Sequence, residues 1–200
     1  MEEKRERILK AALALFLRRG FDATTMDDVA AKAQIAKGTL YLHFKDKADL
    51  YASILEEKIN ALSQALNGIA ASDATPTAKL ETIIRRNLEF IANEYSGAEF
   101  FHHTQVGHNP EVLKLNRTRI TPRLEKQLGV IAGVVKQGIA AREFRKVDPF
   151  NVAVRVFGLV NLNLMRRALD PKPMDPATEA AALRDFVFHG ISARQGEAKS

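Results

Sequence analysis

The chain of 200 residues contains no cysteine, which excludes disulfide bonds, a thiolate nucleophile and any metal site with cysteine ligands. It also lacks a convincing membrane span, because its most apolar stretch, residues 147–165, includes Arg155 and three asparagines. The first ten residues, MEEKRERILK, are charged rather than apolar, so we expect no secretory signal. These absences predict a soluble, cytoplasmic protein without a membrane partner.

Motifs that would indicate an enzyme are also missing. No G-x-S-x-G, phosphate-binding loop or Ser/His/Asp arrangement occurs at a recognisable spacing. Glu99 and His102 have the i, i+3 spacing of a carboxylate-bridged metal motif, and His103 and His108 lie nearby. That motif needs a second pair on a facing helix, which the sequence does not offer. We therefore predict no catalytic residue, no metal and no cofactor.

The charge of the chain suits an anionic partner without locating its binding site. The net charge is +6. Residues 1–50 hold ten basic and eight acidic side chains, and residues 51–200 hold twenty and sixteen. Both parts are mildly basic, so any binding region has to be found from motifs. A hydrophobic content of 46% supports a sizeable core in one or two domains.

The first fifty residues have the pattern of three short helices. Apolar residues at helical spacing predict the first helix over residues 3–19, and Gly20 ends it in the left-handed conformation. Thr25 followed by Asp28 predicts a capping box at the start of the second helix. A turn at residues 34–36 then leads into a third helix. This arrangement is typical of a helix-turn-helix.

The third helix, residues 37–44, turns Leu40 and Phe44 inward. Its outward positions are Lys37, Gly38, Thr39, Tyr41, Leu42 and His43. Four of these carry side chains that reach phosphates and base edges, namely Lys37, Thr39, Tyr41 and His43. Lys47 follows at a helix N-terminus. A phosphate there would interact with the charge of Lys47 and with the free backbone N–H groups of the helix. Such an exposed face predicts a DNA-binding helix.

Less specific interpretations of these residues stay open. A helix-turn-helix can be purely structural, Tyr41 can be a core aromatic, and His43 can be a C-terminal capping group. Lys4, Arg5 and Arg7 form either a solvated helix face or an arm that enters a DNA groove.

Several motifs with fixed spacing resemble the N-terminal domain of the TetR family of transcriptional regulators, over about residues 5–50. They are Gly20-Phe21, Thr24-Thr25, Val29-Ala30, residues 35–41, His43-Phe44 and residues 47–50. The resemblance implies that some side chains contact backbone phosphates: Thr25, Thr39, Tyr41, His43 and Lys47. It places Lys37, Gly38 and Leu42 nearest the base edges. Gln34 departs from the family's usual glycine, at a cost of roughly 1–2 kcal/mol if that residue is left-handed.

The remainder of the chain keeps a helical pattern. The expected helices span residues 51–71, 77–95, 150–169, 176–193 and a segment from Pro110 that Pro122 should kink or split. We therefore predict an all-α fold of about nine helices. Residues 1–50 would form the helix-turn-helix DNA-binding domain, and residues 51–200 a helical effector-binding and dimerisation domain.

An effector pocket is predicted in the core of residues 75–165. Beside the apolar stripe of the helix over 77–95 runs a mixed line of side chains, which is either a cavity wall or a boundary between core and solvent. The candidate pocket residues are Asn87, Phe90, Phe101, Gln105 and Asn161. A basic cluster is either a solvated helix face or a pocket for an anionic head group: Lys114, Arg117, Arg119, Arg123 and Lys126.

A homodimer is predicted from both ends of the chain. One recognition helix covers only half a DNA site, so a two-fold dimer would read two half-sites. The last two helices carry surplus apolar surface, and the resemblance implies dimerisation there. The predicted interface is Val156, Leu183, Phe186, Val187 and Ile191.

The function predicted from these features is a ligand-responsive, DNA-binding transcriptional regulator. It would bind a palindromic operator on double-stranded DNA. Repression, relieved by a small and largely apolar effector, is the outcome that the family resemblance favours. An activator and an effector-independent DNA-binding module are the alternatives.

Overall fold

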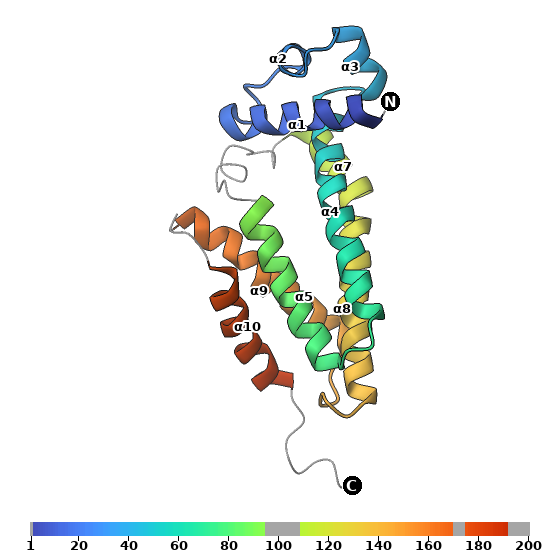
Figure 1. The fold of residues 1–200 in the computed structure, drawn as a ribbon, viewed down its shortest axis with the longest axis vertical. Coiled ribbons are helices and arrows are strands. Elements are labelled where there is room, and N and C mark those ends of the chain that lie inside the picture. The colour runs from blue at the N-terminus through green and yellow to red at the C-terminus, as the bar shows by residue number, and fades with distance from the viewer. Residues whose placement is uncertain (1, 95–108, 170–174, 192–200) are drawn as a thin grey trace. The chain divides into compact units, whose positions relative to one another are not determined.

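The computed structural model describes residues 2–94, 109–169 and 175–191, and every regular element in these ranges is a helix (Figure 1). The elements are α1 (Glu2–Arg19), α2 (Met26–Lys32), α3 (Lys37–His43), α4 (Lys47–Ala71), α5 (Pro76–Glu94), α7 (Pro110–Leu115), the π-helical η2 (Asn116–Ile120), α8 (Thr121–Ala140), α9 (Pro149–Leu169) and α10 (Pro176–Ile191). The all-α prediction is confirmed. No helix in the described ranges is long and apolar enough to cross a membrane.

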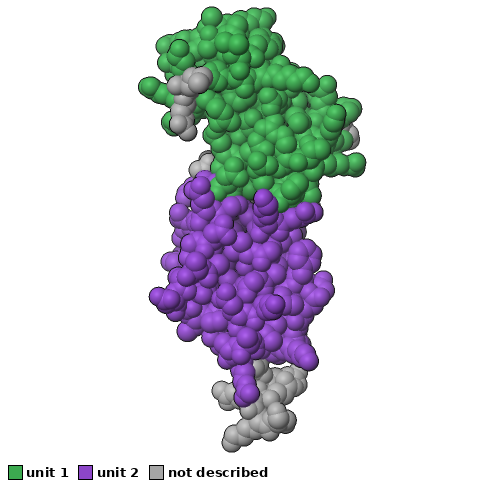
Figure 2. Space-filling model, turned by 90° about the vertical axis from the view of Figure 1, so that its right-hand side faces the viewer, with its two compact units in different colours: residues 1–60, 97–123 green, residues 61–96, 124–200 purple. Residues whose placement is uncertain are grey.

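The chain separates into two compact units (Figure 2). The first comprises residues 1–60 and 97–123, and the second comprises residues 61–96 and 124–200. The predicted domain boundary after residue 50 remains a prediction.

Aromatic packing joins the first helix of the first unit to the turn that follows it. Gly20 has a φ of 81°, which ends α1 in the predicted left-handed conformation. Phe21 is then buried, with its ring centroid 5.5 Å from that of Phe16 and 5.4 Å from that of Tyr51 on α4. These contacts fix the direction in which the chain enters α2.

The helix-turn-helix forms as the sequence predicts. Thr25 and Asp28 make the full capping box of α2, with the Thr25 Oγ1 accepting from the Asp28 N–H at 3.1 Å. Gln34 has a φ of 53°, so the turn does hold a non-glycine residue in the left-handed region. Leu40 and Phe44 are both buried, which orients the opposite face of α3 toward solvent.

The segment around Pro122 is not split, because it continues as helix through a π-helical turn. α7, η2 and α8 follow one another without a break, and the five residues of η2 form a π-helical turn. The Thr121 N–H bonds to the Asn116 carbonyl, five residues back. Because proline has no N–H and its ring crowds the carbonyl four residues earlier, this wider turn accommodates Pro122 within a continuous helix.

The second unit is built around a mainly aliphatic core from α5, α8, α9 and α10, together with Leu62 and Leu66 from the end of α4. α5 lies beside α9 and α10, and α8 completes the core (Figure 1). The core side chains include Leu80, Ile83 and Leu88 of α5, Ile131, Val134 and Val135 of α8, Val152, Val156 and Val160 of α9, and Val187 of α10. At the end of α8, Gly138 lies directly against the ring of Phe144.

Candidate nucleic-acid interface

The outward face of α3 is strongly exposed, as a DNA-contacting surface requires. Leu42 exposes 85% of its surface and Tyr41 exposes 47%. Lys37 and Gly38 are also exposed, whereas Thr39 and His43 are half-buried. An apolar side chain as exposed as Leu42 has no role in the chain's own core and suits contact with a partner.

Four of the predicted DNA-contacting residues surround one shallow concavity of about 350 Å³. They are Thr25, Lys37, Tyr41 and Lys47, and their neighbours there include Asp22 and Asp27. Three helices and the turn before α2 therefore bring these side chains together. The two aspartates were not predicted, because nothing in their local sequence pattern marks them as members of this surface.

Lys37 is held by an acidic neighbour on α2. Its Nζ lies 2.7 Å from Asp27 Oδ1 and 3.0 Å from Asp27 Oδ2, and both side chains are more than half exposed. The hydrogen bond and the charge attraction from Asp27 raise the pKa of Lys37 above its ordinary value. An exposed pair of this kind contributes about 0–1 kcal/mol, so DNA can displace Asp27 at little cost.

Lys47 points toward the backbone of the turn after α1. Its Nζ donates to the Phe21 carbonyl at 2.7 Å and to the Asp22 carbonyl at 3.1 Å, and it lies 4.5 Å from the centroid of the Phe21 ring. Burial lowers the pKa of Lys47 below its ordinary value. Lys47 therefore braces the start of the helix-turn-helix, a role that the sequence did not predict.

Thr25 is engaged within its own capping box. Its backbone N–H and its Oγ1 both donate to Asp28 Oδ2, at 2.9 Å and 2.7 Å. The hydrogen bond from the Thr25 hydroxyl lowers the pKa of Asp28. Thr25 is exposed beside Lys37, so it remains accessible while it caps α2.

The basic residues near the N-terminus lie within α1 and do not form a free arm. Arg5 pairs with Glu57 of α4, and its guanidinium carbon lies 5.5 Å from the centroid of the Phe44 ring. Lys4 and Arg7 are exposed on the same helix. Arg5 thus contacts Phe44, the residue directly after α3.

The candidate effector residues do not converge in the described part of the chain. Phe90 lines a cavity of about 230 Å³ between α4 and α5, together with Leu62 and Arg86. Asn87 is buried, and its amide donates to the Ile83 carbonyl, while the Asn161 amide donates to the Phe157 carbonyl. Neither lines that cavity. Phe101 and Gln105, like the candidate metal pair Glu99 and His102, lie outside the described residues.

The candidate dimer residues fall into two groups. Val156 and Val187 are 3% and 8% exposed, because they pack in the chain's own core, and Leu183 packs against that core. Phe186 is 68% exposed, and the side chain of Ile191 lies outside the described part. Exposed apolar surface on α9 lies within the predicted interface helix, at residues that were not singled out there: Phe150, Val154 and Leu162.

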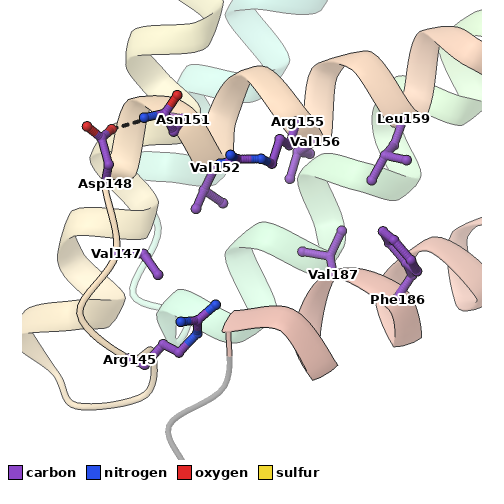
Figure 3. A pocket seen from close by; sticks show the side chains of 10 residues that line it. All are labelled: Arg145, Val147, Asp148, Asn151, Val152, Arg155, Val156, Leu159, Phe186 and Val187. Atoms are coloured by element: carbon purple, nitrogen blue, oxygen red, sulfur yellow. Dashed lines mark hydrogen bonds between the residues drawn. The ribbon is translucent and has the colours of Figure 1, made fainter.

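A groove of about 360 Å³ separates the first half of α9 from α10 (Figure 3). Val152, Val156 and Leu159 project into it from α9, and Val187 faces them from α10. Arg145 enters from the preceding loop (Figure 3). The lining of the groove is thus mainly apolar, and its polar members are Arg145, Asp148, Asn151 and Arg155.

Comparison with known proteins agrees with the helix-turn-helix geometry. Residues 8–54 match the family model described as bacterial regulatory proteins, tetR family. The fatty acid metabolism regulator protein of Bacillus subtilis is 24% identical over 195 residues, which is 96% of this chain and 98% of that protein.

Solved structures share the fold across both units. The regulator FadR from Bacillus subtilis, in complex with stearoyl-CoA, has a TM-score of 0.79 at 22% identity and covers 93% of this chain and 98% of its own. SmeT in a complex with triclosan has a TM-score of 0.79 at 20% identity and covers 97% of this chain and 93% of its own.

Proposed function

Because this chain belongs to the TetR family of transcriptional regulators, we propose that it binds an inverted-repeat operator as a homodimer and is released by an effector with a large apolar part. The observation that carries the proposal is the exposed face of α3 beside the concavity lined by Lys37, Tyr41 and Lys47. Regulation by repression is the outcome that this arrangement serves when the operator overlaps a promoter.

DNA contact would proceed by exchange of partners at this surface. Lys37 would leave Asp27 for a phosphate or a base edge, and Leu42 would meet apolar groups in the major groove. Lys47 has three N–H donors, of which two bind backbone carbonyls, so the third would reach a phosphate. Thr25, Thr39, Tyr41 and His43 would add phosphate contacts that fix the position of α3 on DNA.

The dimer would form through α9 and α10. Phe150, Val154, Gly158 and Leu162 recur every fourth residue of α9, so they form one ridge, and three of them are large and exposed. Nothing lies within 4 Å of where a Gly158 Cβ would be, so a partner helix can approach closely there. Phe186 of α10 supplies further exposed apolar surface.

The effector would bind in the second unit. The two similar structures hold stearoyl-CoA and triclosan, and both molecules have large apolar parts. Asn87, Phe90, Phe101, Gln105 and Asn161 remain the proposed pocket residues. The effector can release DNA only by the ratio of its affinities for the two conformations of the regulator.

The first experiment is selection of bound fragments from the sheared source genome at near-physiological salt. Recovery of a few loci that share an inverted repeat would support a dimeric regulator. Recovery of all fragments equally, or of none, would overturn the proposal. Transcription from a recovered promoter, measured with and without the protein, then separates a repressor from an activator.

A substitution at Lys37 tests the role of α3 directly. Lys37→Met should change the preferred operator sequence, measured by repeating the selection with the variant, because the proposal has Lys37 nearest the base edges. Lys136→Met is the matched control, since it removes the same charge from an exposed position in the second unit. A uniform loss of affinity with an unchanged sequence preference would reassign Lys37 to a backbone contact.

A further inference from the structure

The π-helical turn η2 is an irregular feature that the proposed function does not use. A π-helical turn is rare and is frequently found at functional sites. Here the Oδ1 atom of Asn116, at its start, is buried and has no hydrogen-bond partner in the described part of the chain. A buried acceptor without a partner is unfavourable, so this turn is held in place by contacts made elsewhere.

Those contacts are made by Arg119, which lies within η2. Its guanidinium binds three side chains on one face of α4, spaced four and three residues apart: Asp49, Ser53 and Glu56. The Nε and Nη2 atoms form a fork on the two oxygens of Glu56, with Nε at 3.0 Å from Oε1, and Nη2 also lies 3.0 Å from Ser53 Oγ. A forked arginine–carboxylate pair is among the strongest charge-assisted contacts.

The pairing is partly shielded from water and reinforced by a second arginine. The side chains of Arg119 and Glu56 are 27% and 13% exposed, so solvent screens their attraction less than on an open surface. Arg123 adds a contact to Glu56 at 2.9 Å. Hydrogen bonding to Glu56 raises the pKa of Arg119 further above its usual range, so the arginine stays charged.

Asp49 connects this cluster to the turn that follows α3. One of its oxygens accepts from Arg119, and the other accepts from the backbone N–H of Lys45 at 2.9 Å. Lys45 lies two residues beyond the end of α3, in the turn between α3 and α4. The Asp49 carboxylate thus links Arg119 to the backbone of the turn that follows α3.

We propose that Arg119 is a positioning residue for DNA recognition, which acts on α3 through Asp49 and the backbone of Lys45. The inference rests on the proposed function, since it deepens the account of how DNA affinity is controlled. The wide turn of η2 sets the direction of Arg119. In regular α-helical register, one residue more or less rotates a side chain by about 100°, which would take the guanidinium off α4.

The primary test measures operator affinity over a range of salt concentrations for Arg119→Met. We expect a loss of about 2- to 30-fold, the usual range for coupling through packed and charged networks. The slope of log K against log[salt] should stay that of the wild type, because Arg119 acts through Asp49 and touches no phosphate. Arg119→Lys should restore part of the affinity, since an ammonium keeps the charge without the fork.

The matched control is Arg117→Met, which removes the same charge from an exposed position in the same turn. It should leave operator affinity within about twofold of the wild type, less than most coupling effects. The proposal would be overturned by an equal loss of affinity in both variants or by an unchanged affinity for Arg119→Met. A salt slope changed by about one unit in Arg119→Met would also overturn it, because that change would indicate a direct phosphate contact.

A measurement without DNA separates this inference from the proposed function. Hydrogen exchange at the Lys45 amide should become faster in Arg119→Met and stay unchanged in Arg117→Met, while the amides of α1 keep their wild-type rates. If the wild-type protein binds no operator, the proposed function fails, and exchange at Lys45 still decides whether Arg119 holds the turn. Unchanged exchange at Lys45 would overturn the positioning role.

Discussion

Gln34 shows how one residue can work against the local backbone. It occupies the left-handed region with a φ of 53°, and its side chain is exposed, so no packing compensates for the strain. The turn is kept by the helices on either side, because the Ile35 N–H bonds to the Ala30 carbonyl at 3.0 Å. The free-energy cost of a left-handed glutamine, expected from the sequence, is therefore present in the folded chain.

Gln34→Gly should raise the free energy of unfolding by about 0.5–1 kcal/mol. Relief of left-handed strain gains roughly 1–2 kcal/mol, and the greater freedom of glycine in the unfolded chain offsets part of it. Thermal or urea unfolding measures the difference.

Ala31→Gly is the control for this change, since Ala31 is an exposed residue within regular α2. It should lower stability by about 0.5–1 kcal/mol. A loss of stability in Gln34→Gly as well would mean that the glutamine side chain contributes to the turn.

Single residues also show where prediction from sequence succeeds and where it stops. The capping box at Thr25 and the left-handed Gly20 were predictable, because both depend on neighbours within four residues. The pairing of Arg119 with Glu56 was not, since its partners lie 63 and 70 residues away and helical periodicity says nothing about which faces meet. The same limit hid the contact of Lys47 with the Phe21 carbonyl.

At the scale of an element, the end of α8 requires a residue without a side chain at Gly138. A Cβ on Gly138 would overlap the ring of Phe144, and the N–H groups of Glu143 and Phe144 both bond to the Gly138 carbonyl. The chain therefore turns back tightly over the glycine. This arrangement places Phe144 in the core of the second unit, where its ring lies 5.9 Å from that of Phe188 on α10.

Gly138→Ala should lower the free energy of unfolding by about 1–3 kcal/mol, the usual cost of forcing extra atoms into a packed core. Gly129→Ala, in the same helix and with open space around its Cβ, should instead raise stability by up to about 1 kcal/mol. Urea unfolding of the two variants compares a tight contact with an ordinary helix position. Equal stabilisation by both would show that Phe144 can move aside.

The sequence predicted helices over nearly all of the described elements, because apolar stripes and proline or glycine boundaries are local signals. It did not predict the π-helical form of η2, since Pro122 signals only that the helix must deviate. Whether the chain kinks, breaks or widens depends on packing against other elements. The contact of Arg119 with α4 favours the widened form.

At the scale of the whole molecule, the proposed dimer assigns different roles to neighbouring apolar residues, which their sequence pattern alone cannot distinguish. Phe186 and Val187 are neighbours on α10, yet they are 68% and 8% exposed. Only Phe186 is available to a second copy, whereas Val187 belongs to the core of its own chain.

Phe186→Asp should therefore give folded monomers, measured by sedimentation together with circular dichroism. Val187→Asp should unfold the second unit, because it places a charge in an apolar core. Ala181→Asp, at an exposed position elsewhere on α10, should leave a dimer. Folded dimers of Phe186→Asp would move the proposed interface away from this part of α10.

The pair formed by Asp27 and Lys37 has a consequence for how the protein would search for its operator. In the free protein this aspartate acts as a built-in competitor that occupies the lysine before any polyanion arrives. Each encounter with random DNA then exchanges one oxygen partner for another with little net gain, so unproductive complexes separate quickly. Lys37 would stay bound to DNA only at a sequence that also makes favourable contacts with the other residues of α3. Discrimination between sequences would thus arise from short dwell times on wrong sites.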